Sequence, residues 1–153
     1  MGKVIGGILG LGIYLWVVPA AWANSCHHDN NNFRCVEFVS NYDGDTFRVI
    51  IPQVHPFFGE DISVRVIGID APEIRTHDEC EKRMALKAKE ELKELLETSH
   101  EITLRSIGKD KYFRVLADVK FDGKDLAEEL LKRRLAVPYD GGTKPHTNWC
   151  KFE

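Results

Sequence analysis

An apolar segment in the first half of the chain, Val64–Ile69, carries one arginine in its interior and runs into acids. Arg65 interrupts valine and isoleucine residues, and Asp70 and Glu73 follow the segment, held apart by Ala71-Pro72. Burying an arginine in a strand is costly unless an anion meets it. We therefore expect one side of this strand to face charged groups.

Two further elements complement these residues. Asp43-Gly44-Asp45-Thr46 precedes the segment, and Arg114 follows it within Asp110–Arg114. Carboxylates suit a hard divalent cation, a remaining acid can take a proton from water, and two arginines can grip a phosphate. Taken singly, each acidic motif has a structural explanation, because Asp-Gly is a common turn and acids favour helix starts. Taken together, they predict phosphodiester chemistry.

The order and spacing of these motifs resemble the staphylococcal-nuclease-like (thermonuclease) family over about residues 36–139. The matching segments are Tyr42–Thr46, Val64–Glu73, Asp110–Ala117, Asp122-Gly123 and Leu135-Ala136. A single Asp-Gly-Asp-Thr would be a weak match, whereas several motifs in order are specific. The chain departs from the family at Phe113, where relatives often have glycine, and in its short tail after Tyr139.

The resemblance implies a metal site and a general base. Asp45 and Asp70 match the carboxylate ligands of Ca²⁺, and Ala71 matches the position that lends its backbone carbonyl. Glu73 matches the acid that takes a proton from the attacking water. Two carboxylates and a carbonyl leave room at Ca²⁺ for water and a phosphate oxygen.

The resemblance also implies how substrate is held. Arg65 and Arg114 match the two arginines that grip the scissile phosphate. Lys111 and Tyr112 match positions near the terminal phosphate of a bound nucleotide. Tyr112 and Tyr139 are candidate contacts to a base or sugar, with a structural role as the alternative for Tyr139.

These assignments imply an exported Ca²⁺-dependent phosphodiesterase that hydrolyses DNA and RNA with little sugar specificity and leaves 3′-phosphate ends. Single-stranded or frayed substrate is the expected preference, because a barrel groove can stack exposed bases. We expect a monomer. The alternatives are a non-catalytic OB-fold module that binds nucleic acid or a partner, and a small exported metal or redox protein. No Cys-x-x-Cys occurs, which weakens the redox alternative.

The N-terminus has the features of an export signal. Lys3 supplies a positive charge, Val4–Ala23 is almost wholly apolar, and Ala21-Trp22-Ala23 offers a cleavage site. We predict a signal peptide over residues 1–23, a nuclease domain over 24–153, and a secreted or periplasmic protein without stable membrane association after cleavage. The alternative is an uncleaved membrane anchor, because the apolar run is long enough to span a bilayer.

Four cysteines, Cys26, Cys35, Cys80 and Cys150, all follow the predicted cleavage site. An even number in an exported chain favours disulfides, and four cysteines allow three pairings. A bridge between Cys26 and Cys35 would close a short loop. The alternative is a metal site made by these two cysteines with His27 and His28, although their spacing matches no usual zinc pattern.

The 153 residues, 43% hydrophobic and 29% charged, are typical of one globular domain, and the net charge of −3 argues against indiscriminate coating of nucleic acid. We predict a mainly β fold with helices: a five-stranded OB-fold-like barrel with a helix between strands 3 and 4 and a short second helix. The strands are predicted at 35–40, 46–51, 62–69, 101–107 and 114–121, and the helices at 81–97 and 125–134. Residues 52–61 are predicted as a loop in which Phe57-Phe58 packs onto the sheet.

Overall fold

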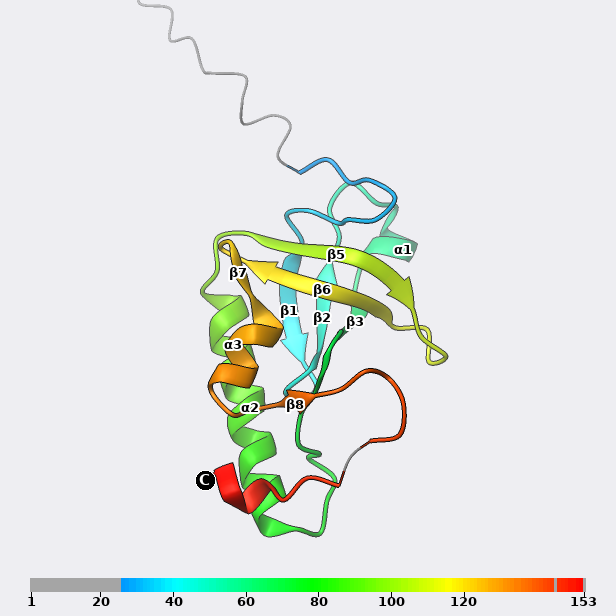
Figure 1. The fold of residues 1–153 in the computed structure, drawn as a ribbon. Coiled ribbons are helices and arrows are strands. Elements are labelled where there is room, and N and C mark those ends of the chain that lie inside the picture. Colours follow the sequence, from blue (N-terminus) through cyan, green and yellow to red (C-terminus); the bar gives the residue numbers. More distant parts are fainter. Residues whose placement is uncertain (1–25, 145, 153) are drawn as a thin grey trace, which may run out of the picture.

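The computed structural model describes residues 26–144 and 146–152, and the predicted signal peptide, residues 1–23, lies outside them. The described chain forms a main sheet of six strands, in the order β1-β2-β3-β6-β5 with β7 paired to β6, and a two-stranded sheet of β4 and β8 (Figure 1). The bounds are β1 Glu37–Asn41, β2 Thr46–Ile50, β3 Ile62–Val66, β4 Ile69–Asp70, β5 Ile102–Lys109, β6 Val115–Phe121, β7 Lys124–Asp125 and β8 Val137–Pro138.

The strand pairing confirms a mainly β fold with helices but not a closed five-stranded barrel. β3 and β6 run parallel, and the other neighbouring strands run antiparallel. β1 and β5 form the two edges of the main sheet. Within the described residues, the segment that leads into β1 reaches β5 through a bridge between Phe33 and Leu104 and a 3.0 Å hydrogen bond from the amide of Val36 to the carbonyl of Ile102.

The predicted helix between the third and fourth long strands is α2, Glu79–Glu97. It begins two residues before the predicted start because the carboxylate of Asp78 accepts hydrogen bonds from the amides of Cys80 and Glu81. Its buried stripe follows helical spacing and consists of Met84, Ala85, Ala88, Leu92 and Leu96. The second predicted helix is α3, Leu126–Lys132, capped by Asp125. Within residues 26–144 and 146–152, no helix has the length and apolar character needed to cross a membrane.

Three details of the predicted loop and third strand are wrong. The segment 52–61 contains a short helix, α1 (Pro56–Gly59), whose first turn is capped by His55. Phe57 and Phe58 do not pack onto the sheet, since they remain 81% and 67% exposed. The predicted strand 62–69 is divided, because Gly68 adopts a φ of 85° and turns the chain between β3 and β4.

Both pairs of cysteines form disulfides, Cys26–Cys35 and Cys80–Cys150. The alternative of a metal site at Cys26 and Cys35 is therefore wrong, because a disulfide leaves no thiolate for a metal. The second bridge ties the start of α2 to the C-terminal 3-10 turn η2 (Trp149–Phe152), in which Trp149 is buried. The tail is thus fixed by both Trp149 and Cys150.

Candidate active site

A cavity of about 840 Å³ lies where the β1–β2 turn, the β3–β4 segment, the β5–β6 hairpin and the C-terminal tail meet. The predicted site residues that line it are Asp45, Arg65, Ala71, Glu73, Lys111, Tyr112, Arg114 and Tyr139. Asp70 lies directly beside it and contacts Arg65. Segments far apart in the sequence therefore converge on one site, and every residue predicted for that site is found there.

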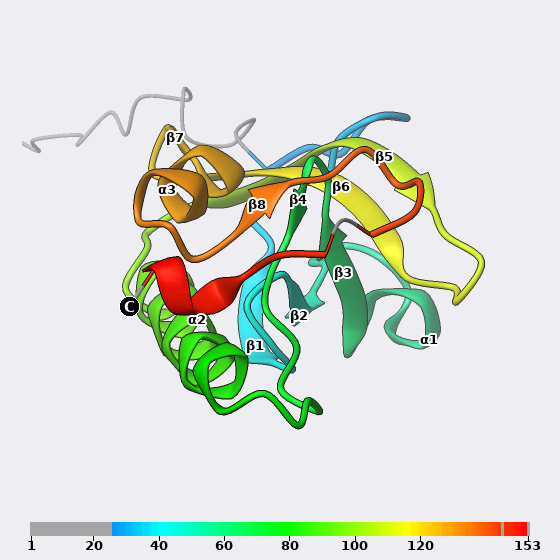
Figure 2. The same ribbon diagram turned by 60° about the horizontal axis from the view of Figure 1, so that its bottom comes forward.

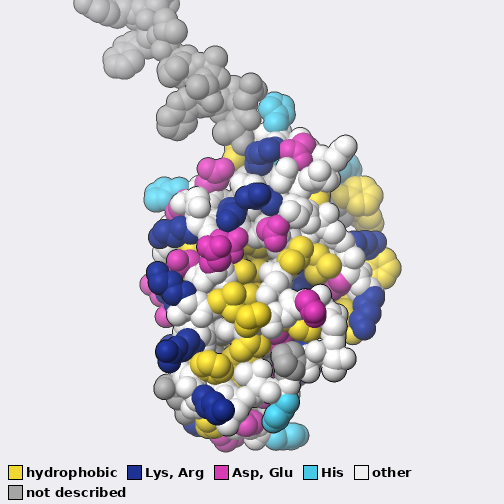
Figure 3. Space-filling model, in the orientation of Figure 1, with side chains coloured by type: hydrophobic (Ala, Val, Ile, Leu, Met, Phe, Trp, Pro, Cys, Tyr) yellow, Lys and Arg dark blue, Asp and Glu magenta, His cyan; other side chains and the backbone are white. Residues whose placement is uncertain are grey.

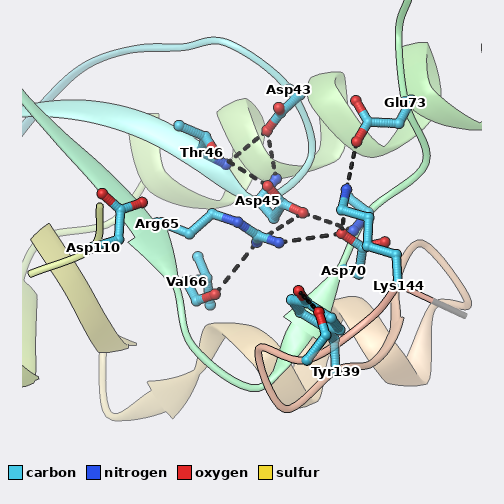
Figure 4. A network of polar contacts seen from close by, with 12 residues as sticks. Asp43, Asp45, Thr46, Arg65, Val66, Asp70, Glu73, Asp110, Tyr139 and Lys144 are labelled. Carbon is cyan, nitrogen blue, oxygen red and sulfur yellow. Dashed lines mark hydrogen bonds and ion pairs between the residues drawn. The ribbon is translucent and has the colours of Figure 1, made fainter. Parts of the chain in front are cut away.

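Arg65 is the centre of this site (Figure 4). Its Nη1 lies 2.8 Å from Oδ2 of Asp45, and its Nη2 lies 3.2 Å from Oδ1 of Asp70. The three residues are 8%, 5% and 6% exposed, respectively. The expectation that the arginine faces charged groups is thus met, because two buried carboxylates share one guanidinium. The register of the sheet explains the meeting, since Thr46, next to Asp45, pairs with Arg65 across β2 and β3.

The β1–β2 turn fixes the position of Asp45. Oδ1 of Asp43 accepts hydrogen bonds from the amides of Asp45 (3.0 Å) and Thr46 (2.8 Å). Gly44 packs so closely on α2 that a Cβ placed there would lie 2.6 Å from the Cβ of Ala88. The first aspartate and the glycine of the motif therefore hold the turn, and the second aspartate points into the site.

Both oxygens of Asp45 are engaged. Oδ2 accepts a 2.7 Å hydrogen bond from the amide of Ala71, and Oδ1 accepts one of 3.0 Å from the hydroxyl of Thr46. Burial raises the pKa of Asp45 to about 7, although the guanidinium of Arg65 acts in the opposite direction. A cation added beside this carboxylate would favour its charged form and lower that pKa.

Asp110 orients Arg114, and both residues lie in the β5–β6 hairpin. The carboxylate of Asp110 accepts hydrogen bonds from Nε of Arg114 (2.7 Å) and from the amides of Arg114 (2.9 Å) and Tyr112 (2.8 Å). Desolvation opposes ionisation of Asp110, but these hydrogen bonds outweigh it and lower its pKa. The guanidinium of Arg114 also lies 5.4 Å from the ring centre of Tyr112. Asp110 thus aims the second arginine at the cavity.

Glu73 lies at the rim of the cavity on the loop between β4 and α2. Its amide donates a 3.1 Å hydrogen bond to Oε1 of Glu81, which fixes the loop to the first turn of α2. Its carboxylate is 54% exposed and pairs with the ammonium of Lys144 (Figure 4). The candidate base is therefore open to solvent while its backbone is held.

Lys144 is a site residue that the sequence did not reveal. Its Nζ lies 2.9 Å from Oδ1 of Asp70 and also binds Glu73. Partial burial lowers the pKa of Lys144, but its contacts with Glu73 and Asp70 outweigh this and raise it. Gly141-Gly142 before it is the only local signal, and it indicates a turn without showing where the following lysine points.

The C-terminal tail reaches the site because it is fixed at both ends. β8 pairs with β4, and the amide of Tyr139 donates a 3.0 Å hydrogen bond to the carbonyl of Gly68. The hydroxyl of Tyr139 donates to the carbonyl of Gly142 at 2.7 Å. At the other end, Cys150 is bonded to Cys80. Tyr139 thus shapes the loop that carries Lys144 and also lines the cavity.

The donor set suits a hard cation. Two buried carboxylates, those of Asp45 and Asp70, lie on either side of Arg65 and offer oxygen ligands. Among the residues that the structure describes, the one group of three potential ligands within mutual reach is Asp78, Cys80 and Cys150, and its two cysteines are disulfide-bonded. Asp45, Asp70 and Glu73 do not gather around one point, which agrees with Glu73 acting beside a metal rather than as its ligand.

Asp45 gives the metal-free protein a predictable pH dependence. Its pKa is about 7 in the folded chain against 3.8 for a free aspartate, so folding favours the protonated form. The stability that this proton contributes is complete below about pH 4 and is lost as pH rises to about 7. In chelator, we expect the unfolding free energy of the wild type to fall across this range relative to that of Asp45→Asn, measured by urea titration. Parallel pH profiles for the two proteins would contradict it.

Residues 63–149 match the family model described as staphylococcal nuclease homologue. Endonuclease YncB of Bacillus subtilis (strain 168) is 35% identical over 125 residues, which cover 76% of this chain and 56% of that protein. The SPbeta prophage-derived endonuclease YokF of the same organism is 35% identical over 108 residues, covering 67% of this chain and 34% of YokF. The probable endonuclease C19F8.04c of Schizosaccharomyces pombe is 36% identical over 89 residues, covering 54% and 38%.

The chain spans about half or less of the length of these curated relatives. The family match itself covers more than half of the chain and includes most of β3, the β4–α2 loop, the β5–β6 hairpin and the tail that carries Lys144. Together with the convergence of the predicted residues on one cavity, it identifies this chain as a member of the staphylococcal nuclease homologue family.

Proposed function

We propose that this chain is a Ca²⁺-dependent nuclease that hydrolyses phosphodiester bonds of DNA and RNA. The observation that carries the proposal is the buried arrangement of Arg65 between Asp45 and Asp70, in a cavity that Arg114 and Glu73 also line. Keeping three charged side chains buried in one place is costly for a purely structural purpose. The names of the three relatives, all endonucleases, point in the same direction.

The arginines would bind the scissile phosphate. Arg65 enters the cavity from β3 and Arg114 enters from the hairpin, so their guanidinium groups approach a phosphate from different elements. Planar guanidinium groups form paired hydrogen bonds with phosphate oxygens, and these strengthen as charge builds in the transition state. Asp110 keeps Arg114 aimed, and the two aspartates keep Arg65 in place.

Glu73 would accept the proton of the attacking water. Its exposed carboxylate can meet water at the rim, and Pro72 separates it from Asp70 so that it need not bind the metal. The bond formed is from water oxygen to phosphorus, and the bond broken joins phosphorus to the 5′ oxygen, which leaves a 3′-phosphate. The contact with Lys144 holds the carboxylate of Glu73 toward the cavity.

Asp45, Asp70 and the backbone carbonyl of Ala71 would hold the metal. When bound, Ca²⁺ supplies positive charge that polarises the phosphate and orients the nucleophilic water. Lys144 pairs with the same Asp70, so a bound ion would share that carboxylate with the ammonium of Lys144.

A digestion assay tests the proposal and separates it from a non-catalytic binding module. Oxidised protein is incubated with plasmid DNA or with RNA in Ca²⁺, and again with excess chelator. We expect cutting of both substrates with Ca²⁺ and its loss with chelator, because chelator removes the ion that Asp45 and Asp70 would hold. Cutting that persists in chelator would exclude the metal assignment. Binding of nucleic acid without cutting would favour the OB-fold binding module.

The remaining features of the proposal concern substrate form and location. The order β1-β2-β3-β6-β5 with β3 parallel to β6 supports an OB-like binding face, and such faces favour single-stranded or frayed strands. The two disulfides support export to an oxidising compartment. We propose a monomer, secreted or periplasmic, that needs no membrane association to act.

A further inference from the structure

Three phenylalanines are strongly exposed, and one of them, Phe113, lies between Tyr112 and Arg114 of the candidate active site. Phe57 and Phe58 of α1 are 81% and 67% exposed, and Phe113 in the β5–β6 hairpin is 80% exposed. Phe57 and Phe58 contact each other edge to face, with ring centres 5.0 Å apart. Exposed aromatic rings that serve no packing purpose commonly mark a binding surface. We name these three residues the aromatic platform.

The sheet places the members of the aromatic platform at one end of the molecule. β3 and β6 run parallel, with Val64 opposite Val115. The segments that precede these two strands, α1 and the tip of the β5–β6 hairpin, therefore emerge at the same end of neighbouring strands. Both ribbon views show them on the same side (Figures 1 and 2). The space-filling view shows hydrophobic and basic side chains gathered along that edge (Figure 3).

The backbone of Phe113 has a conformation that is unfavourable for a phenylalanine. Its φ is 65°, in the left-handed region where a bulky side chain is strained and glycine is not. An 80% exposed ring buries too little surface to offset that strain. A strained residue without a packing role points to a functional one.

The platform adjoins the cavity at Phe113 and carries positive charge there. Tyr112 lines the cavity and precedes Phe113, and Lys111 lies 5.1 Å from the ring of Tyr112. Nζ of Lys109 lies 4.1 Å from the ring centre of Phe113. Glu60 follows α1 and is exposed, and Asp61 after it is paired with Arg48. Aromatic rings alternating with ammonium groups match the bases and phosphates of a single strand.

We propose that the aromatic platform stacks the unpaired bases of a single-stranded polynucleotide beyond the nucleotide held at the cavity. This proposal rests on the proposed nuclease function and extends it, since it gives the substrate class a structural basis outside the catalytic residues. Bases in a duplex are already stacked on one another, so the platform discriminates for single strands. Tyr112 connects the platform to the phosphate that Arg114 binds.

Fluorescence anisotropy tests the proposal with a labelled oligothymidylate of about twelve nucleotides. The Glu73→Gln chain in Ca²⁺ serves as background so that the strand stays intact. We expect Phe113→Gly and the double change Phe57→Ala/Phe58→Ala each to raise Kd by about tenfold, because base stacking on one ring contributes that much. Phe113→Trp restores binding and Phe113→Leu does not, since stacking needs an aromatic face.

Three controls make the result decisive. Leu86→Ala removes an exposed apolar side chain from α2 and leaves the affinity unchanged. Phe113→Gly melts at or above the wild-type temperature, because glycine relieves the left-handed strain. Platform variants that keep Glu73 cut a dinucleotide at the wild-type rate, because a dinucleotide does not reach the platform.

Equal oligonucleotide affinity for all variants would overturn the proposal. It would also be overturned if the platform variants bound the oligonucleotide as the wild type does but lost binding to vesicles of anionic phosphatidylglycerol. That second result would assign the platform to a membrane surface. Either result leaves the nuclease proposal standing if the dinucleotide is cut. Failure of the wild type in Ca²⁺ to cut the dinucleotide and also plasmid DNA and RNA would instead refute the nuclease function itself.

Discussion

Glu73→Gln should lower turnover by about 10²–10⁴ while leaving nucleotide affinity close to that of the wild type. General-base catalysis contributes a factor of this size, and an amide of the same shape cannot accept the proton. Affinity should be preserved because, in the proposed function, Arg65 and Arg114 bind the phosphate, and neither is paired with Glu73. Single-turnover cleavage and nucleotide titration of the same preparation measure the two quantities separately.

A matched control is available directly after α1. Glu60 is exposed and lies outside the cavity lining, so Glu60→Gln should leave both turnover and affinity unchanged. Stability should also be nearly unchanged in Glu73→Gln, since the carboxylate is more than half exposed and its pair with Lys144 is solvated. Wild-type turnover in Glu73→Gln would place the base elsewhere. A parallel rise in Kd would indicate that Glu73 positions substrate instead.

The elements that position this site were predictable wherever local pattern and burial agree. The spacing of Ala85, Ala88, Leu92 and Leu96 predicted α2, and Asp78 explains why the helix begins earlier than the apolar pattern does. Arg65 was informative for the same reason, because an arginine among buried valines needs a counter-charge. Because burying a charge is costly, the sequence alone predicted that Arg65 lies among charged groups.

What the sequence did not disclose depends on contacts between distant segments. Lys144 reaches Asp70 because β8 pairs with β4 and because Cys150 bonds to Cys80, and neither contact has a local signature. The exposure of Phe57 and Phe58 was missed because apolar residues are usually buried, and here the short helix α1 turns them outward. The strain at Phe113 also becomes visible only in the backbone angle.

Replacing either of the two arginines should lower the cleavage rate to a similar extent under the proposed function, but the two replacements should differ in their effect on the stability of the protein. Arg65→Met and Arg114→Met should each lower the cleavage rate by about 10²–10³, the usual loss for one donor to transition-state charge. Arg65→Met should also lower the unfolding free energy in chelator by about 3–5 kcal/mol, because it leaves two buried carboxylates without their shared guanidinium. Arg114→Met should cost about 1 kcal/mol or less, since its pair with Asp110 is partly solvated.

The difference in stability loss between Arg65→Met and Arg114→Met follows from the deeper burial of Arg65. The pH dependence of the loss in Arg65→Met gives a second measurement. Near pH 5 the carboxylate of Asp45 can take up a proton, so the stability loss in Arg65→Met should be smaller there than at pH 8. Arg48→Met is the matched control, because its exposed pair with Asp61 lies away from the cavity and should affect neither rate nor stability. Urea titrations at both pH values and single-turnover rates provide the measurements. Equal stability losses for Arg65→Met and Arg114→Met would mean that the guanidinium of Arg65 does not neutralise the buried carboxylates. The assignment of Asp45 and Asp70 as a cation site would then lose its basis.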